Sequence, residues 1–211
     1  MQANQADMTA AAGGDPIALA LLGYFGLFFL LAFFWPTWRL WRRHGTNALV
    51  LPRDDSAHGI VAKWFRATLV VIPVILGVVV AGVAVEALGR MAWLEIDPVR
   101  LAGWTILAVS LLWVMAAQAQ MGASWRIGID AAAQPPLVRS GLFALSRNPI
   151  FLGMRFALLG LFLVLPTGAT LAILLLGEVL MQVQVRLEEA HLTEAIGPEY
   201  ETYRRSTRRW L

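Results

Sequence analysis

Long apolar stretches restrict the fold of this 211-residue chain more than any other feature of its sequence. Five of them follow one another, at residues 16–36, 67–89, 101–121, 150–165 and 168–186. About 20 apolar residues in a helix cross the roughly 30 Å hydrocarbon core of a bilayer, and the last two stretches are the shortest. A composition of 58% hydrophobic and 15% charged residues is typical of the same class. We therefore predict an all-α, polytopic integral membrane protein with about five transmembrane helices.

The predicted helices divide the chain into three parts. Residues 1–15 are small and polar and lack the basic segment of a signal peptide, so we expect a mobile N-terminal tail. Residues 16–121 hold the first three helices, and residues 122–211 hold a loop, the last two helices and a C-terminal tail. The sequence "LPTGA" at 165–169 predicts a tight turn, which makes the last two helices an antiparallel hairpin.

Lysines and arginines are distributed unevenly among the connecting segments. They are concentrated between the first two helices, after the third helix and in the C-terminal tail. Such segments stay on the cytoplasmic side of a membrane. The pattern predicts five spans, with the N-terminus outside and the tail in the cytoplasm.

Several classes of site and partner are disfavoured. The chain has no cysteine, and its three histidines show none of the spacings of zinc ligands, so we predict no metal site. The run "WRLWRRH" at 38–44 alternates aromatic and basic residues, as some nucleic-acid-binding segments do. At the end of a membrane helix this run is more typical of an anchor among lipid headgroups. We therefore expect membrane lipids, and no nucleic acid, as partners.

Ionisable residues inside apolar stretches are candidates for function, because hydrocarbon disfavours charge. Arg155 lies 12 residues before Thr167, and Glu178 lies 11 residues after it. An antiparallel hairpin with equal rise in both helices places them at similar depth, as salt-bridge partners. The pair is either structural or part of a binding site, and the sequence favours neither interpretation.

The same count predicts a second polar cluster at the cytoplasmic end of the hairpin. Its members are Arg147, Asn148, Glu188 and Glu189. We expect the two glutamates at the C-terminal end of the last helix. Acidic groups there oppose the helix dipole, which indicates a requirement other than helix stability.

Two longer segments carry a pattern that is known from other proteins. They are "LVRSGLFALSRNPIFLG" and, some 35 residues later, "RLEEAHLTEAIGPEYETYRRSTRRWL". Together they resemble the isoprenylcysteine carboxyl methyltransferase and phospholipid methyltransferase superfamily of membrane enzymes. The family pattern is Arg-x-Pro-x-Tyr-x-Gly, an apolar hairpin, a Glu-Glu pair, and a Gly-x-x-Tyr-x-x-Tyr segment with basic residues. The matching positions are Arg147, Pro149, Phe151, Gly153, Glu188, Glu189, Gly197, Tyr200, Tyr203, Arg208 and Arg209.

The resemblance covers roughly the last 95 residues, and "GASWRIGID" at 122–130 looks like a further element of bacterial members. It implies a bacterial inner-membrane methyltransferase that uses S-adenosylmethionine as methyl donor. The acceptor would be lipophilic or small: a prenylcysteine-type carboxylate, a lipid amine or a thiol. The donor-binding positions implied are Arg147, Asn148, Pro149, Phe151, Gly153, Glu188, Glu189 and Tyr200.

Three residues are candidates for a part in the reaction. Arg126 and Arg155 would hold a carboxylate of the donor or acceptor, although each is also explained as a structural or interfacial cation. His191 would be a base for a thiol or amine acceptor. We expect it three residues past a helix end, where a histidine is also explained as a solvated interfacial residue.

Two other functions remain open. Membrane sterol reductases resemble this superfamily in their C-terminal half but use NADPH; they are typically longer, and the small size of this chain disfavours that interpretation. A non-catalytic membrane scaffold is the other alternative, because Phe151 stands where tyrosine is usual. Stacking by the ring does not need the missing hydroxyl, which favours an active enzyme.

Overall fold

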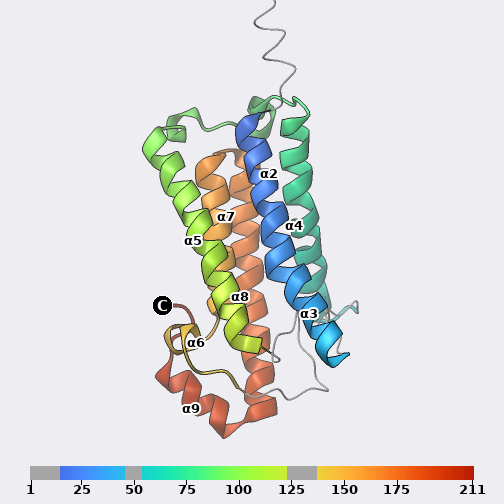
Figure 1. Cartoon of the computed structure of the whole chain (residues 1–211), viewed down its shortest axis with the longest axis vertical. Helices are drawn as coiled ribbons and strands as arrows, with labels where there is room; N and C mark the ends of the chain where they lie inside the picture. Colours follow the sequence, from blue (N-terminus) through green and yellow to red (C-terminus); the bar gives the residue numbers. More distant parts are fainter. Residues whose placement is uncertain (1–14, 46–53, 123–136) are drawn as a thin grey trace, which may run out of the picture.

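The computed structural model describes residues 15–45, 54–122 and 137–211, and the regular elements in these ranges are helices (Figure 1). In chain order they are α2 (Pro16–Phe29), the π-helix η1 (Leu30–Phe34), α3 (Trp35–His44), α4 (Ala57–Val80), the 3₁₀ helices η2 (Val85–Leu88) and η3 (Ala92–Leu94), α5 (Asp97–Met121), α6 (Leu142–Leu145), α7 (Pro149–Val164), α8 (Gly168–Ile196) and α9 (Pro198–Ser206).

The five predicted helices are present in the described residues, and four of them are of membrane length. α2, η1 and α3 form one continuous helix. This helix, α4, α5 and α8 are each long and apolar enough to cross a bilayer, and α7 is a shorter apolar helix of 16 residues. The described part of the chain is therefore all-α and polytopic, as the apolar stretches predicted.

The second helix, α4, begins ten residues before the apolar stretch 67–89 that predicted it and ends nine residues before that stretch ends, so these predicted bounds were wrong. It begins early because the Ser56 hydroxyl accepts a hydrogen bond from the Gly59 amide at 3.1 Å, and such a cap requires no apolar residue. It ends early because Gly82 follows with φ +95°, outside the helical region. The rest of the apolar stretch forms the short helix η2 and its flanks.

The first and last predicted helices continue beyond their apolar stretches, the first to His44 and the last to Ile196. Glutamate, arginine and glutamine are good helix formers, so a helix need not end where the hydrocarbon ends. α8 ends only at Gly197, which has φ +67°. His191 therefore lies inside α8, and the prediction that it follows the helix end was wrong.

The same extension changes the interpretation of the glutamate pair. Glu188 and Glu189 lie about two turns before the end of α8, so their charges do not oppose a helix terminus. Their position needs another explanation, which the contacts of Glu189 supply below.

α7 packs closely on α5 because glycines face the contact. A Cβ atom at Gly153 would lie 2.5 Å from Val114 Cγ2, and one at Gly160 would lie 2.7 Å from Leu107 Cγ. Small residues allow membrane helices to approach to this degree. The other side of α7 packs on α8, which completes the predicted hairpin (Figure 1).

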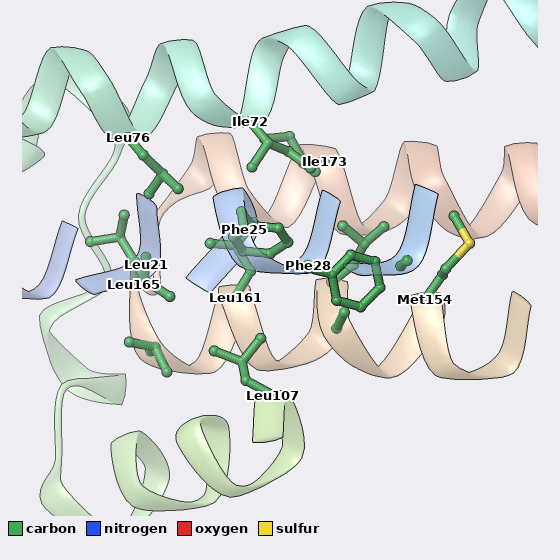
Figure 2. Close-up of a cluster of buried hydrophobic side chains, with 14 of the residues drawn as sticks. Leu21, Phe25, Phe28, Ile72, Leu76, Leu107, Met154, Leu161, Leu165 and Ile173 are labelled. Carbon is green, nitrogen blue, oxygen red and sulfur yellow. The ribbon is translucent and has the colours of Figure 1, made fainter. Parts of the chain in front are cut away.

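The hydrophobic core lies where five helices meet. Figure 2 shows side chains of α2, α4, α5, α7 and α8 converging there: Leu21, Phe25, Phe28, Ile72, Leu76, Leu107, Met154, Leu161, Leu165 and Ile173. A cavity of ≈ 40 Å³ lies beside this core, lined by phenylalanines of α2 and η1 and by residues of α4, α7 and α8. The π-helical turn in the first helix is held from α5, since the Gln118 side chain donates a hydrogen bond to the Ala32 carbonyl.

The bundle has two distinct ends. At the turn end, Thr167 and Thr170 cap α8 through reciprocal hydrogen bonds of 3.1 Å, and Met91 N–H donates to the Pro166 carbonyl at 2.9 Å. At the opposite end, which we call the α9 end, lie α3, α6 and α9 (Figure 1). The segments that the cation distribution placed on one side of the membrane therefore do lie at one end of the bundle.

Candidate functional site

Two segments that are distant in sequence meet at the α9 end of the hairpin. The first is Ser146–Asn148, which leads into α7; Pro149 fixes the first position of that helix. The second is Thr207–Leu211, which follows α9 and which we call the strap. Both segments lie against α8, where the predicted polar cluster is found.

Glu189 is the centre of this cluster and is only 5% exposed. Its Oε1 accepts hydrogen bonds from Arg147 Nη2 at 2.9 Å and from Asn148 Nδ2 at 3.2 Å. Its Oε2 accepts from Arg209 Nη2 at 2.7 Å. Two guanidinium groups and an amide therefore share one buried carboxylate, a charge-assisted arrangement that joins α7, α8 and the strap. The predicted juxtaposition of Arg147 and Asn148 with Glu189 is confirmed.

The strap is bound mainly through its backbone carbonyls. Arg147 Nη1 donates to the Thr207 carbonyl at 2.6 Å, and the Arg147 amide donates to the Arg208 carbonyl at 2.9 Å. The Arg209 carbonyl accepts from the Ser146 hydroxyl at 3.1 Å and from Asn148 Nδ2 at 3.3 Å. The segment before α7 thus holds the strap in an extended conformation across the start of that helix.

Two tyrosines fix α9 beneath the cluster. The Tyr203 hydroxyl donates to the Phe143 carbonyl at 2.6 Å, and the ring of Tyr200 lies 6.1 Å from that of Tyr203. Tyr200 is 1% exposed. Burial raises the pKa of Tyr203 to about 12, and burial together with the Glu189 carboxylate raises the pKa of Tyr200 above its ordinary value. Both phenols are therefore neutral at physiological pH.

The second predicted pair, Arg155 and Glu178, is confirmed and is bidentate. Arg155 Nε lies 2.6 Å from Glu178 Oε2, and Arg155 Nη2 lies 2.9 Å from Glu178 Oε1. Two further groups join it: Gln182 Nε2 donates to Glu178 Oε1 at 2.8 Å, and the ring of Trp210 lies 4.3 Å from Arg155 Cζ. The strap therefore reaches the deeper pair as well as the cluster at Glu189.

The other predicted residues lie apart from these contacts. Glu188 is half-buried, and among the residues that the structure describes no hydrogen bond or ion pair engages its carboxylate. Phe151 packs against the hydrophobic core, and Gly153 faces α5. His191 lies one turn beyond Glu188 on α8 and is also half-buried. Arg126, with the rest of the element at 122–130 beyond Gly122, lies outside the described residues.

Two residues of the strap were missing from the predicted site. Arg209 was part of the matched pattern but had no predicted role, and Trp210 was not considered at all. The sequence "RRW" at 208–210 could have indicated these contacts. Its arginines can bind a carboxylate, and its tryptophan ring can pack on a cation from another part of the chain.

Comparison with known families agrees with this geometry. The family model described as phospholipid methyltransferase matches residues 99–199. Residues 99–199 form a phospholipid methyltransferase domain. The domain extends from the first turn of α5 to the first turn of α9, so it contains Arg147, Asn148 and the glutamate pair, whereas the strap follows it. No curated protein and no solved structure matches the chain significantly.

The match bears on the functional classes that the sequence left open. Its family indicates a methyltransferase in a membrane, and the four long apolar helices of the described chain agree with that location. Glu189, Arg147 and Asn148 lie within the matched segment, and Arg209 joins them from the strap that follows it.

Proposed function

We propose that this protein transfers a methyl group from S-adenosylmethionine to a lipophilic or small acceptor at the cytoplasmic face of the membrane. The observation that carries the proposal is the half-buried carboxylate of Glu188, which has no hydrogen-bond or ion-pair partner among the described residues and lies inside the matched segment, directly beside the cluster around Glu189. A carboxylate that has lost water without gaining a partner favours a cationic or hydroxyl-bearing ligand.

The residues present fit such a donor. Glu188 would attract an ammonium group or accept hydrogen bonds from ribose hydroxyls. Glu189 has a different role, because its two carboxylate oxygens already accept hydrogen bonds from Arg147, Asn148 and Arg209. It would position the walls of the donor site rather than contact the donor.

The donor, when bound, supplies an electrophilic methyl group on a sulfonium. The chain's own residues would align this group with the acceptor and exclude water, which are the main requirements of an in-line displacement. A carboxylate acceptor needs no general base. For a thiol or amine acceptor, His191 lies one turn from Glu188 on α8 and is the candidate to receive the proton.

In this proposal, Arg155 has a structural role and does not contact the substrate. Its charge is already balanced by Glu178, and its guanidinium is covered by Trp210, so it does not present a free cation to an acceptor. The pair instead joins the two helices of the hairpin.

We propose that the α9 end faces the cytoplasm of a bacterial cell and that the N-terminus faces outward. Support comes from the exposed arginines of α3 and α9, which gather at this end, and from the tendency of such residues to remain on the cytoplasmic side. The donor, which is a soluble cytoplasmic molecule, would then reach Glu188 directly.

Calorimetry of the purified protein in detergent tests the donor site. We expect binding of S-adenosylmethionine and none of NADPH. Loss of a charge-assisted hydrogen bond in Glu188→Gln should weaken donor binding by about ten- to a hundred-fold. Glu194→Gln is the matched control, because Glu194 is an exposed carboxylate on the same helix, and it should bind the donor normally.

Mass spectrometry then tests the reaction. Lipid extract, small thiols and prenylated cysteine are mixed with protein and donor, and products that gain a methyl mass are identified. Tight NADPH binding without a response to the methyl donor would support a reductase instead. Donor binding without turnover of any acceptor class would support a scaffold that retains the site.

A further inference from the structure

The strap occupies hydrogen-bond donors of Arg147 and Asn148, two residues that the superfamily resemblance implies for binding of S-adenosylmethionine. An arginine has five N–H donors. In Arg147 four hydrogen bonds use them: two go to Glu189 and two go to the carbonyls of Arg204 and Thr207. Asn148 Nδ2 is bound to Glu189 and to the Arg209 carbonyl. While the strap is docked, neither side chain can turn to a ligand without losing these bonds.

In addition to the hydrogen bonds to its backbone carbonyls, the strap makes two side-chain contacts. One is the ion pair of Arg209 with Glu189, at 2.7 Å. The other is Trp210 over Arg155, at 4.3 Å. The strap begins in an extended conformation at Thr207, with φ −127° and ψ 135°, and the residues after Thr207 are not helical. Such contacts are reversible and need no unfolding of a helix to separate.

Space is available beside the strap. A cavity of ≈ 260 Å³ lies between α5 and α7, and its wall includes Trp113, Phe156 and Leu211. Leu211 is 59% exposed, so the strap borders this cavity without filling it. The strap can therefore change position at this point without displacing core side chains.

We propose that the strap is a movable lid on the donor site and that Trp210 is its latch. The inference rests on the proposed function. With the lid open, Arg147 and Asn148 lose their bonds to the Thr207 and Arg209 carbonyls and can turn these N–H groups to S-adenosylmethionine, while both side chains stay bonded to Glu189. With the lid closed, as in this structure, Trp210 packs on Arg155, and the strap carbonyls accept hydrogen bonds from Arg147 and Asn148. Trp210 is thus a positioning residue, which acts through Arg155 and the strap.

Thiol labelling measures the lid directly, because the natural chain has no cysteine. Ser146 is 0% exposed, and its hydroxyl donates to a strap carbonyl, so Ser146→Cys places a thiol beneath the lid. Trp210→Ala should raise the maleimide labelling rate of this thiol by about ten-fold, because the cation–π contact is lost. Trp210→Phe should raise it less, since phenylalanine keeps an aromatic face.

Thr68→Cys is the control for general loosening. Thr68 is also a buried hydroxyl residue, but it lies on α4, away from the strap, so its labelling should not change with Trp210→Ala. An equal labelling rate of Ser146→Cys with and without Trp210 would overturn the latch. A parallel rise at Thr68→Cys would do the same, because it would show a general loss of structure.

Cross-linking tests whether the lid must open. Leu211→Cys and Phe156→Cys line the same cavity and can be joined by a cleavable bis-thiol reagent. The joined protein should lose binding of S-adenosylmethionine in calorimetry and regain it after cleavage. Unchanged binding in the joined state would refute the lid. Absence of donor binding in the parent protein would refute the proposed function, while the labelling rates would still decide whether the strap moves.

Discussion

Removal of the Glu189 charge should release the tail of the protein from the hairpin. Glu189 and the Arg147 side chain are 6% and 9% exposed, whereas the Arg209 side chain is 33% exposed. Breaking a buried ion pair by removing one partner destabilises by about 3–5 kcal/mol, because the remaining charge stays buried without compensation. Glutamine keeps one acceptor oxygen for Asn148, so we expect Glu189→Gln to lie near 3 kcal/mol, at the lower end of that range.

The two arginines should differ in a way that follows from their exposure. Arg209→Gln should destabilise by only about 1 kcal/mol, since its partly solvated charge is screened. Arg147→Gln should destabilise more, by roughly 2–3 kcal/mol, because it also removes hydrogen bonds to two carbonyls of the tail. Combining Arg147→Gln with Glu189→Gln should destabilise less than the sum of the two changes, since the single variants each leave an unpaired charge.

Thermal unfolding in detergent, followed by tryptophan fluorescence, measures this series. For a chain of this size 1 kcal/mol corresponds to about 2–4 °C, so Glu189→Gln should melt roughly 6–12 °C lower. Glu194→Gln, which changes an exposed carboxylate of the same helix, should melt like the parent. A fall of less than about 2 °C for Glu189→Gln, or strict additivity with Arg147→Gln, would refute the reasoning that Glu189 is a structural centre.

Three further outcomes are expected. Glu178→Gln should lower detergent stability more than Arg155→Leu, because arginine cannot shed its charge, and the double variant should recover much of the loss in the same melting assay. Gly153→Ala should destabilise by about 1–3 kcal/mol in that assay, since its Cβ would lie 2.5 Å from a side chain of α5. The pKa of Tyr203 is raised from 10.0 to about 12, so its contribution to stability is complete below pH 10 and is lost as the pH rises to 12. Tyr203→Phe should therefore reduce the alkaline fall in melting temperature, and an unchanged fall would show that this phenol is not the cause.

The helices could be predicted from the sequence, but their ends could not. Hydropathy reports which residues lie in hydrocarbon, and that was enough to find the four membrane-length helices and the shorter α7. The ends depend on local chemistry that hydropathy does not contain. α4 begins at the Ser56 cap, and α8 continues through charged residues until Gly197. The predicted place of His191 was wrong for this reason alone.

Contacts within the hairpin were predictable, and contacts with the strap were not. Two antiparallel helices with a short turn have equal rise, so counting from Thr167 was sufficient to pair Arg155 with Glu178. The strap has no periodicity, and its partners are mostly backbone carbonyls, which every residue possesses. No spacing in the sequence therefore indicates that Trp210 covers Arg155. The roles in donor binding that the superfamily resemblance implies for individual residues remain predictions.

The geometry of a helix separates the two glutamates of the motif. Consecutive residues lie 100° apart around the axis, so Glu188 and Glu189 cannot both face α7. Glu189 shares its face with Glu178 and binds Arg147 and Arg209, whereas Glu188 lies seven residues after Met181, on the face that lines the small apolar cavity. One carboxylate thereby has a structural role, and the proposed function assigns its neighbour to the methyl donor. Glu189→Gln should accordingly change the melting temperature, and Glu188→Gln should change donor affinity at an unaltered melting temperature. A variant of Glu188 that melts as low as that of Glu189 would show that the two carboxylates do not differ in this way.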